Sequence, residues 1–255
     1  MTTEFDESKV LVVDDEPSLA NALGCVLLTE GYHVRTAAEG RNALASFHEW
    51  RPRLVITDLR MAPMDGIELC RQIRAQSNVP IIVVSGEDHE VSKIEALDSG
   101  ADDYVVKPFN AGELLARVRA VLRRGMDTTS DSAGSLGVGD FLIDLDTRRV
   151  YVDASEVRLT PKQFDLLLYL ARRPDQVVPH ARLLSAVWGG EYSEHREYLR
   201  VFMRQLRKKL EDNPSRPRYL LTEHLIGYRF SPRGEVDKAS PRHERATGNL
   251  AQQLS

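Results

Sequence analysis

Short apolar runs alternate with amphipathic segments over the first half of the chain. The runs cover residues 10–13, 33–36, 53–57, 80–85 and 103–107. The segments between them have helical character, and residues 18–30 and 114–123 are two examples. Strands that alternate with helices predict an α/β domain over residues 8–124, with a doubly wound, five-stranded parallel sheet. Ligands of such sheets bind outside the carboxyl ends of the strands, where the strand order reverses.

The pattern changes after residues 125–137, which are small and polar and predict a flexible linker. Residues 141–160 contain short alternating runs, which are typical of a small antiparallel sheet. Residues 218–230 predict two strands joined by a turn. Helical patterns lie between these regions, at residues 161–172, 180–188 and 196–210. We therefore expect an α+β domain over residues 138–231, followed by a disordered, polar tail at 232–255.

The first helix of this second domain has a clear start signal. Thr160 is a suitable N-cap, Pro161 suits the first helical position, and Gln163 can complete a capping box. We therefore expect this helix to begin at Pro161.

Composition and charge add three points. The 255 residues suggest two domains, and the absence of a long apolar window or a signal peptide favours a cytoplasmic protein without a membrane segment. Cys25 and Cys70 are the only cysteines and favour a reducing compartment. Residues 1–124 hold 14 basic and 20 acidic residues, a net of −6, and the remainder holds 34−14=20 and 38−20=18, a net of +2. This asymmetry indicates that the two domains have different tasks.

Carboxylates follow two of the predicted strands. Asp14 and Asp15 come directly after the first strand, and Asp58 follows the third. In the flavodoxin-like strand order these two strands are neighbours, so three carboxylates would converge at one edge of the sheet. Such a cluster suits Mg²⁺, which prefers oxygen ligands. The alternative is that one aspartate simply caps the following helix.

Two further polar residues end strands at the same predicted edge. Ser85 ends the fourth strand and Lys107 the fifth. An ammonium, a hydroxyl and a metal together suit phosphoryl transfer, with Asp58 as the nucleophile. Singly, Lys107 could be a solvated surface charge and Ser85 a turn residue. Together with the aspartates they favour a phosphoryl-transfer site.

The helix predicted at residues 196–210 is basic on one side. Its apolar stripe consists of Leu199, Met203, Leu206 and Leu210. Its other side carries Arg196, Arg200, Arg204 and Arg207. Arginine can bind guanine edges and phosphates, although a basic stripe is often only a solvated face. Helices followed by a hairpin favour a helix-turn-helix with a wing, and hence DNA binding.

The first half resembles the receiver domain of bacterial response regulators, through "VVDDEP", "ITDLRMAPMDG", "VVSGE" and "SGADDYVVKPF". The resemblance implies that Asp58 accepts a phosphoryl group from a sensor histidine kinase. It also implies that Mg²⁺ binds Asp15 directly, Asp14 through water, and the backbone carbonyl of Arg60. By the same resemblance Lys107 contacts the phosphoryl group, and Ser85 and Tyr104 are the switch residues. One departure is Ala62, where the family usually has proline, with Pro63 following.

The second half resembles the winged-helix domain of the OmpR/PhoB family, through "LTPKQFDLLLYLA", "LLSAVWG", "LRKKLEDNP" and "GYRF". Residues 196–230 and the serine at position 85 also resemble the potassium-responsive regulators of this family. His224 and Leu225 depart from that subgroup, which usually has a small residue and a glycine at the wing turn. We expect the DNA-binding residues to be Arg196, Arg200, Arg204, Arg207, Lys208, Tyr228 and Arg229.

These resemblances imply a transcription regulator, not an enzyme, that dimerises when phosphorylated, binds promoter DNA and acts with RNA polymerase, with potassium-transport genes as candidate targets. They also imply a dimer face on the fourth helix, fifth strand and fifth helix, with pairs of Lys93 and Glu113, Asp103 and Arg117, and Asp98 and Arg124 across a two-fold axis. Three alternatives stay open: a regulator of another stimulus, a regulator that binds DNA without phosphorylation, and a phosphohydrolase with an aspartyl-phosphate intermediate. The intact set of pocket residues disfavours the second, and the absence of an evident cap domain disfavours the third.

Overall fold

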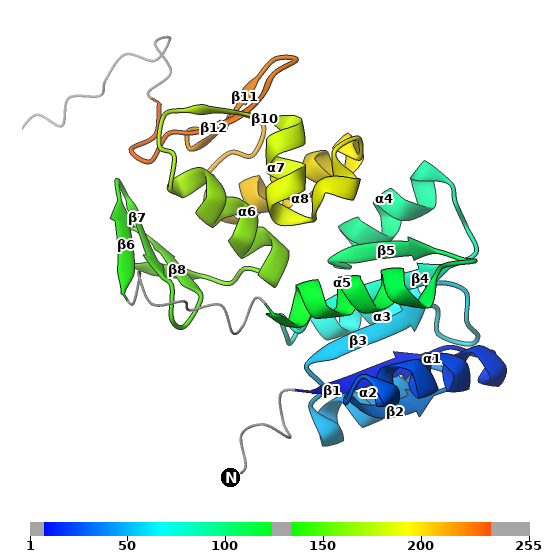
Figure 1. Ribbon diagram of the computed structural model, residues 1–255. Helices are drawn as coiled ribbons and strands as arrows, with labels where there is room; N and C mark the ends of the chain where they lie inside the picture. Colours follow the sequence, from blue (N-terminus) through cyan, green and yellow to red (C-terminus); the bar gives the residue numbers. More distant parts are fainter. Residues whose placement is uncertain (1–7, 124–133, 236–255) are drawn as a thin grey trace, which may run out of the picture.

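A computed structural model describes residues 8–123 and 134–235 of the chain (Figure 1). The first domain has five strands in the order β2-β1-β3-β4-β5, all parallel, as the sequence predicts. The strands are β1 Lys9–Val13, β2 His33–Ala37, β3 Leu54–Asp58, β4 Ile81–Ser85 and β5 Asp103–Val106. The helices are α1 Pro17–Thr29, α2 Gly40–Trp50, α3 Gly66–Arg74, α4 Glu90–Asp98 and α5 Ala111–Arg123.

Alternation along the strands divides the core of this domain between the two faces of the sheet. In β1, Val10 and Val12 pack in one cluster with apolar residues of α1 and α5. Leu11 and Val13 point the other way and pack with residues of α2, α3 and α4. Because both faces are covered, the central strands β1, β3 and β4 are mostly apolar and polar side chains gather at their ends, whereas the edge strand β2 is more exposed and contains polar residues.

Over the described residues 134–235, the second domain contains two antiparallel sheets and three α-helices. One sheet has the order β6-β7-β8-β9 and the other β10-β12-β11. The strands are β6 Ser135–Val138, β7 Phe141–Asp144, β8 Arg149–Val152, β9 Ser155–Val157, β10 Val177–Pro179, β11 Leu220–Glu223 and β12 Gly227–Phe230. The helices are α6 Pro161–Ala171, α7 His180–Val187, the short 3-10 turn η1 Gly190–Tyr192, and α8 Arg196–Leu210. The helices followed by the β11–β12 hairpin form the predicted winged helix.

The local signals for the helices of this domain are confirmed. Thr160 caps α6, and its side chain and that of Gln163 form the reciprocal bonds of a capping box. The predicted apolar stripe of α8 is buried, and its members are Leu199, Met203, Leu206 and Leu210.

Two predicted domain boundaries differ from the structure. Strand β6 begins at Ser135, inside the predicted linker, because residues 135–138 pair with β7 and complete an antiparallel sheet. At the other end, residues 232–235 belong to the folded domain and not to the tail. The carbonyl of Pro232 accepts a hydrogen bond from the N–H of Asp140 at 2.9 Å, and the N–H of Glu235 donates to Arg218 at 3.0 Å. The rest of the predicted linker and tail lies outside the described residues.

The wing turn is built by the residues that depart from the subgroup pattern. Leu225 adopts a left-handed backbone conformation with φ of 64° and is 81% exposed. The N–H of Ile226 donates to the carbonyl of Glu223 at 3.1 Å and closes the turn.

No helix of the described residues is long and apolar enough to span a membrane.

Candidate phosphoacceptor pocket and DNA interface

Two buried carboxylates of the first domain meet at one ammonium group. Asp14 follows β1 and Asp58 ends β3, and the two residues are 3% and 6% exposed. The Nζ of Lys107 lies 2.8 Å from an oxygen of Asp58 and 3.0 Å from an oxygen of Asp14. Burial disfavours the charged form of Lys107, but its bonds to the two carboxylates outweigh this and raise its pKa. The fold therefore brings these three side chains together at one edge of the sheet.

The predicted cluster of three carboxylates is not assembled. Among the described residues, no three acidic, histidine or cysteine side chains lie close enough to hold a metal ion. The reason is that Asp15 lies exposed at the surface, while Lys107 supplies the positive charge between Asp14 and Asp58. The donor set of buried and exposed carboxylate oxygens at one sheet edge still has the chemistry that Mg²⁺ prefers.

Ser85 and Tyr104 are both buried beside this pocket. The Oγ of Ser85 accepts a hydrogen bond from the N–H of Glu87 at 3.2 Å. The hydroxyl of Tyr104 donates to the carbonyl of Glu87 at 2.7 Å. Burial raises the pKa of this phenol. Tyr104, which the resemblance implies is a switch residue, is 3% exposed, so its side chain faces inward in this structure.

Glu87 is a residue of this pocket that the sequence did not reveal. Its carboxylate lies 2.6 Å from the guanidinium of Arg60, in addition to the contacts of its backbone with Ser85 and Tyr104. The N–H of Arg60 donates to Asp58 at 2.8 Å. The loops after β3 and β4 are thereby joined next to the phosphoacceptor candidate. Although Ala62 and Pro63 depart from the usual family sequence, Arg60 still lies beside Asp58.

Several residues of the predicted dimer face contact other residues of the same chain. A guanidinium nitrogen of Arg117 lies 3.2 Å from Asp103 and another lies 2.6 Å from Glu113. The Nζ of Lys93 lies 2.5 Å from Asp88. These ion pairs within one chain are alternatives to the predicted pairs across a two-fold axis, which stay a prediction.

Asp98 and Arg124 are the remaining predicted pair of that dimer face. Asp98 forms an ion pair with Arg204 of α8. Arg124 lies outside the described residues. The side chain of Asp98 thus contacts the second domain.

The basic residues predicted to bind DNA divide into two groups. Arg196, Arg200 and Lys208 are exposed on α8, as a DNA-contacting face requires. Arg204 is exposed in part but contacts Asp98 of the first domain. This exposed group is the candidate DNA interface.

The other group has structural contacts within the second domain. The guanidinium of Arg207 donates to the carbonyl of Leu220 at 2.6 and 2.9 Å and so ties α8 to β11. Tyr228 is buried. Arg229 pairs with the carboxylates of Glu223 and Glu235. The contact of Arg207 holds the wing against α8, and the ion pairs of Arg229 lie within the hairpin and the segment after it. Sequence alone did not distinguish these contacts from contacts to DNA.

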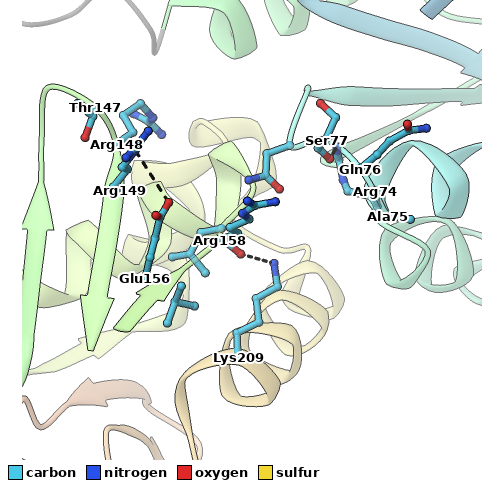
Figure 2. Close-up of a pocket in the computed structure, with 13 residues that line it drawn as sticks. Arg74, Ala75, Gln76, Ser77, Thr147, Arg148, Arg149, Glu156, Arg158 and Lys209 are labelled. Atoms are coloured by element: carbon cyan, nitrogen blue, oxygen red, sulfur yellow. Dashed lines mark hydrogen bonds and ion pairs between the residues drawn. The ribbon is translucent and has the colours of Figure 1, made fainter. Parts of the chain in front are cut away.

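A cleft of about 620 Å³ lies between the two domains (Figure 2). It is lined by the end of α3, by the β8–β9 hairpin and by Lys209 of α8. Two of its basic side chains contact other protein groups: Arg149 lies 3.9 Å from Glu156, and the Nζ of Lys209 donates to the carbonyl of Arg158 at 2.8 Å. The cleft therefore lies at the contact between the domains.

Comparison with known protein families identifies both domains of the chain. Residues 10–119 match the model of the response regulator receiver domain. Residues 154–230 match the model of the C-terminal domain of transcriptional regulatory proteins.

Similar proteins share both domains over nearly their whole length. The chain is 43% identical over 221 residues to the transcriptional regulatory protein KdpE of Mycobacterium tuberculosis, covering 87% of this chain and 98% of that protein. It is 42% identical over 224 residues to the DNA-binding response regulator MtrA of Mycolicibacterium smegmatis, covering 88% and 97%. It is 40% identical over 225 residues to the sensory transduction protein RegX3 of the same organism, covering 88% and 99%. A solved structure of a mutant of the protein RitR has a TM-score of 0.70 at 24% identity, covers 88% of this chain and 99% of that chain, and shares its fold.

Proposed function

The chain belongs to the OmpR/PhoB family of two-component response regulators, which bind DNA to control transcription, and on this premise we propose that Asp58 is its phosphorylated residue. The observation that carries the proposal is the pair of buried carboxylates that contact Lys107 at the carboxyl edge of the sheet. Asp58 is central among these groups. Its carboxylate would attack the phosphorus of a phosphohistidine on a sensor kinase, and the nitrogen–phosphorus bond would break.

Each neighbour of Asp58 has a definite task in this transfer. Lys107 would neutralise the negative charge of the phosphoryl oxygens, and the hydroxyl of Ser85 and the N–H of Arg60 would donate to them. Asp14, Asp15 and Asp58, with the carbonyl of Arg60, would hold Mg²⁺. The metal would supply further positive charge to the phosphoryl oxygens.

Substitution of Asp58 tests this proposal directly. The chain is incubated with acetyl phosphate and Mg²⁺, and its mass is measured. We expect wild type to gain the mass of one phosphoryl group and Asp58→Asn to gain none. Asp65→Asn is the matched control, because Asp65 caps α3 through the N–H of Glu68 and asparagine caps equally well. An adduct that persists in Asp58→Asn would place the phosphoacceptor elsewhere.

We propose that α8 enters the major groove of promoter DNA with Arg196, Arg200 and Lys208 toward the nucleic acid. Two features support this: the basic side of α8 and the wing that follows it. The phosphorylated chain would bind as a dimer on neighbouring half-sites and act with RNA polymerase.

Replacement of Arg200 by alanine tests the orientation of α8. We expect the phosphorylated variant to lose about 1–3 kcal/mol of binding free energy for its selected duplex, and to tolerate more bases at one position, if Arg200 contacts a base edge. A phosphate contact would weaken binding to all sequences alike and reduce the salt dependence. Arg41→Ala, on the exposed side of α2, is the control and should bind as wild type does. Wild-type affinity and specificity in Arg200→Ala would contradict this placement of α8.

We propose in addition that the regulated genes include potassium-transport genes. The support is the resemblance of residues 196–230, the serine at position 85, and the similarity to KdpE. MtrA and RegX3 are nearly as similar, so a regulator of another stimulus is the alternative. Mapping of genomic sites bound by the phosphorylated chain distinguishes the two, because the proposal requires sites upstream of potassium transporters.

A further inference from the structure

The cleft of Figure 2 adjoins a second cavity at the amino end of the receiver sheet. This cavity has a volume of about 530 Å³ and shares Ser77, Asn78 and Arg148 with the cleft. Arg53 lines it and directly precedes β3, whereas Asp58 ends the same strand. The cleft and the cavity together, here called the amino-edge groove, therefore lie at the opposite end of the sheet from the phosphoacceptor pocket.

Positive charge without an acidic partner lines this groove. The side chains of Arg51, Arg53 and Arg158 are exposed, and residues 8–123 and 134–235 supply no carboxylate partner to them. Lys209 binds only neutral groups in the same part of the chain, namely the carbonyl of Arg158 and the amide oxygen of Gln163, each at 2.8 Å. The groove thus has an excess of positive charge.

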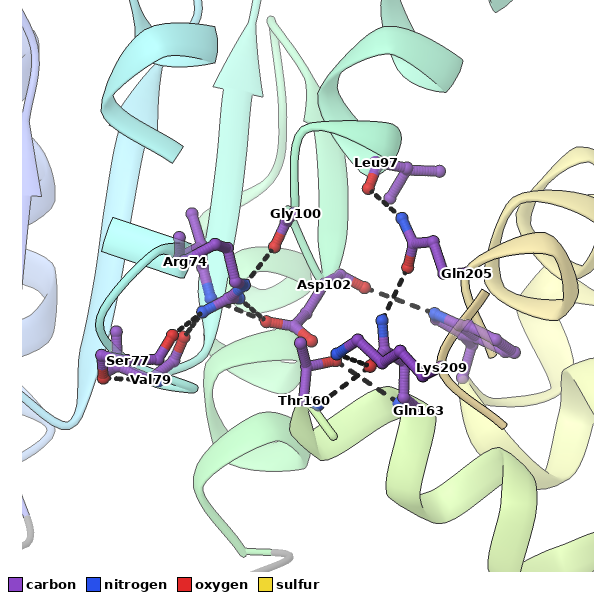
Figure 3. Close-up of polar contacts among 12 residues, drawn as sticks. Arg74, Ser77, Val79, Leu97, Gly100, Asp102, Thr160, Gln163, Gln205 and Lys209 are labelled. Carbon is purple, nitrogen blue, oxygen red and sulfur yellow. Dashed lines mark hydrogen bonds and ion pairs between the residues drawn. The ribbon is translucent and has the colours of Figure 1, made fainter. Parts of the chain in front are cut away.

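Other basic side chains of the groove are neutralised and held in place. The guanidinium of Arg74 lies 2.5 Å from Asp102 and donates to the carbonyl of Gly100 at 2.7 Å, as Figure 3 shows. Arg148 lies 2.6 Å from Asp165. These contacts fix part of the wall, and the excess charge comes from the residues without acidic partners.

The ammonium of Lys209 is destabilised where it stands. Partial desolvation, followed by the nearby charge of Arg74, lowers its pKa. An anion in the groove would offset both effects, because it brings opposite charge to the ammonium.

Two arginines of the groove occupy backbone positions that rarely suit their side chains. Arg51 has a φ of 51° and Arg148 a φ of 54°. The left-handed region favours glycine, and asparagine or aspartate after it. Other residues in this conformation gather at ligand sites, where the side chain is needed. Arginine at both positions is consistent with a use for the guanidinium groups.

The size and chemistry of the groove suit a chain of phosphates. Cavities of about 300–1,000 Å³ typically hold small molecules. Guanidinium groups match phosphate oxygens with two parallel hydrogen bonds. Pro161 also lines the groove and begins α6, and the amino end of a helix favours negative charge. Gln76 and Asn78 add exposed amides that can bind the edge of a base.

We propose that the amino-edge groove binds a small ligand that carries a chain of phosphates, either a nucleotide or an inorganic polyphosphate. The ligand would contact Arg51 and Arg53 of the receiver and Arg158 and Lys209 of the second domain. The site is a second input to the chain. It requires neither phosphorylation of Asp58 nor DNA, so it does not rest on the proposed function.

Calorimetric titration of the full-length chain with ATP, inorganic tripolyphosphate and adenosine tests the groove. The buffer contains EDTA, so that no Mg²⁺ bridges the probes to the phosphoacceptor pocket. We expect saturable binding of at least one phosphate probe, weaker binding at higher salt, and none of adenosine. Tighter binding of ATP than of tripolyphosphate would identify a nucleotide as the ligand, and equal or weaker binding of ATP an inorganic polyphosphate.

Arg158→Gln and Arg51→Gly each remove one guanidinium, from opposite sides of the groove. Each should weaken the phosphate probe about tenfold or more, because charge-assisted hydrogen bonds are lost. Glycine suits the left-handed backbone at position 51, so the fold should be kept, and urea unfolding checks this. Arg41→Gln is the matched control, since it removes an exposed arginine of α2 away from the groove and should bind as wild type does.

Three outcomes would overturn the proposal. Wild type could bind neither phosphate probe at millimolar concentration. The two groove variants could both bind as wild type does, which would place the probe elsewhere on the chain. Arg41→Gln could lose as much affinity as they do, which would reduce the effect to net charge. Weaker binding in either groove variant, with Arg41→Gln unchanged, supports the site.

Discussion

Alanine at Gly66 is expected to destabilise the receiver by about 3 kcal/mol or more and to reduce phosphorylation of Asp58. Gly66 begins α3, and its N–H donates to the carbonyl of Leu59 at 3.0 Å. A Cβ at this position would lie 2.1 Å from the carbonyl oxygen of Asp58 and 3.0 Å from the Cα of Leu59. Both are backbone atoms, so the strain cannot be relieved by a side-chain rotation. The loop that carries the phosphoacceptor must move instead.

Gly24→Ala is the control for this substitution. Gly24 also lies in a receiver helix, but its added Cβ would meet only Val34 at 3.7 Å and Thr36 at 3.9 Å, which are ordinary contacts. Alanine should stabilise α1 by up to about 1 kcal/mol, because glycine is the poorer helix former. Urea unfolding followed by circular dichroism gives both stabilities, and mass after acetyl phosphate treatment gives phosphorylation. Wild-type stability in Gly66→Ala would show that the loop after β3 adapts more easily than its geometry implies.

The architecture of the receiver was predictable because short stretches of sequence indicate its strands and the polar residues at their ends. Strands β1, β3, β4 and β5 each contain an apolar run, and the residues that bear the chemistry stand directly at or after the ends of these runs. The order of the strands then brings Asp14, Asp58, Ser85 and Lys107 to one edge. A pattern that alternates strands with helices leaves few other arrangements.

The finer geometry of the pocket was not predictable from spacing. Sequence places Asp14 and Asp15 side by side, but only the fold shows that the first is buried and the second exposed. The contact of Glu87 with Tyr104 goes through its backbone carbonyl. Any residue could supply that carbonyl, so the sequence contains no signal for it.

The two faces of α8 illustrate a further limit. Arg200 and Arg207 lie on the same helix and look equivalent in its basic pattern. Arg207 nevertheless binds the carbonyl of Leu220, while Arg200 is exposed. The contact between the domains could not be predicted from periodicity either, because it joins residues that are far apart in the sequence, such as Trp188 and Asp102. Tyr192 in "GGEYSEH" is a turn aromatic whose partner, Asp103, lies 89 residues away.

Replacement of Lys107 by methionine is expected to destabilise the receiver by about 2–4 kcal/mol without Mg²⁺. Its ammonium lies within 3.0 Å of both Asp14 and Asp58, whose side chains are only 3% and 8% exposed. Methionine keeps much of the side-chain volume but removes the charge, and a buried charge that loses its partner is strongly unfavourable. The two carboxylates would then repel each other with little solvent between them.

Mg²⁺ should restore more stability to this variant than it adds to wild type. A cation that binds only the folded state stabilises it in proportion to its affinity, and that affinity rises when the competing ammonium is removed. Urea midpoints with and without MgCl₂ measure this difference. Lys93→Met is the control, since Lys93 pairs with the exposed Asp88 and such pairs contribute about 0–1 kcal/mol. Equal Mg²⁺ effects in wild type and Lys107→Met would mean that the ammonium and the metal do not share these carboxylates. A greater effect in the variant would locate the cation at Asp14 and Asp58 by a measurement that needs no phosphoryl transfer.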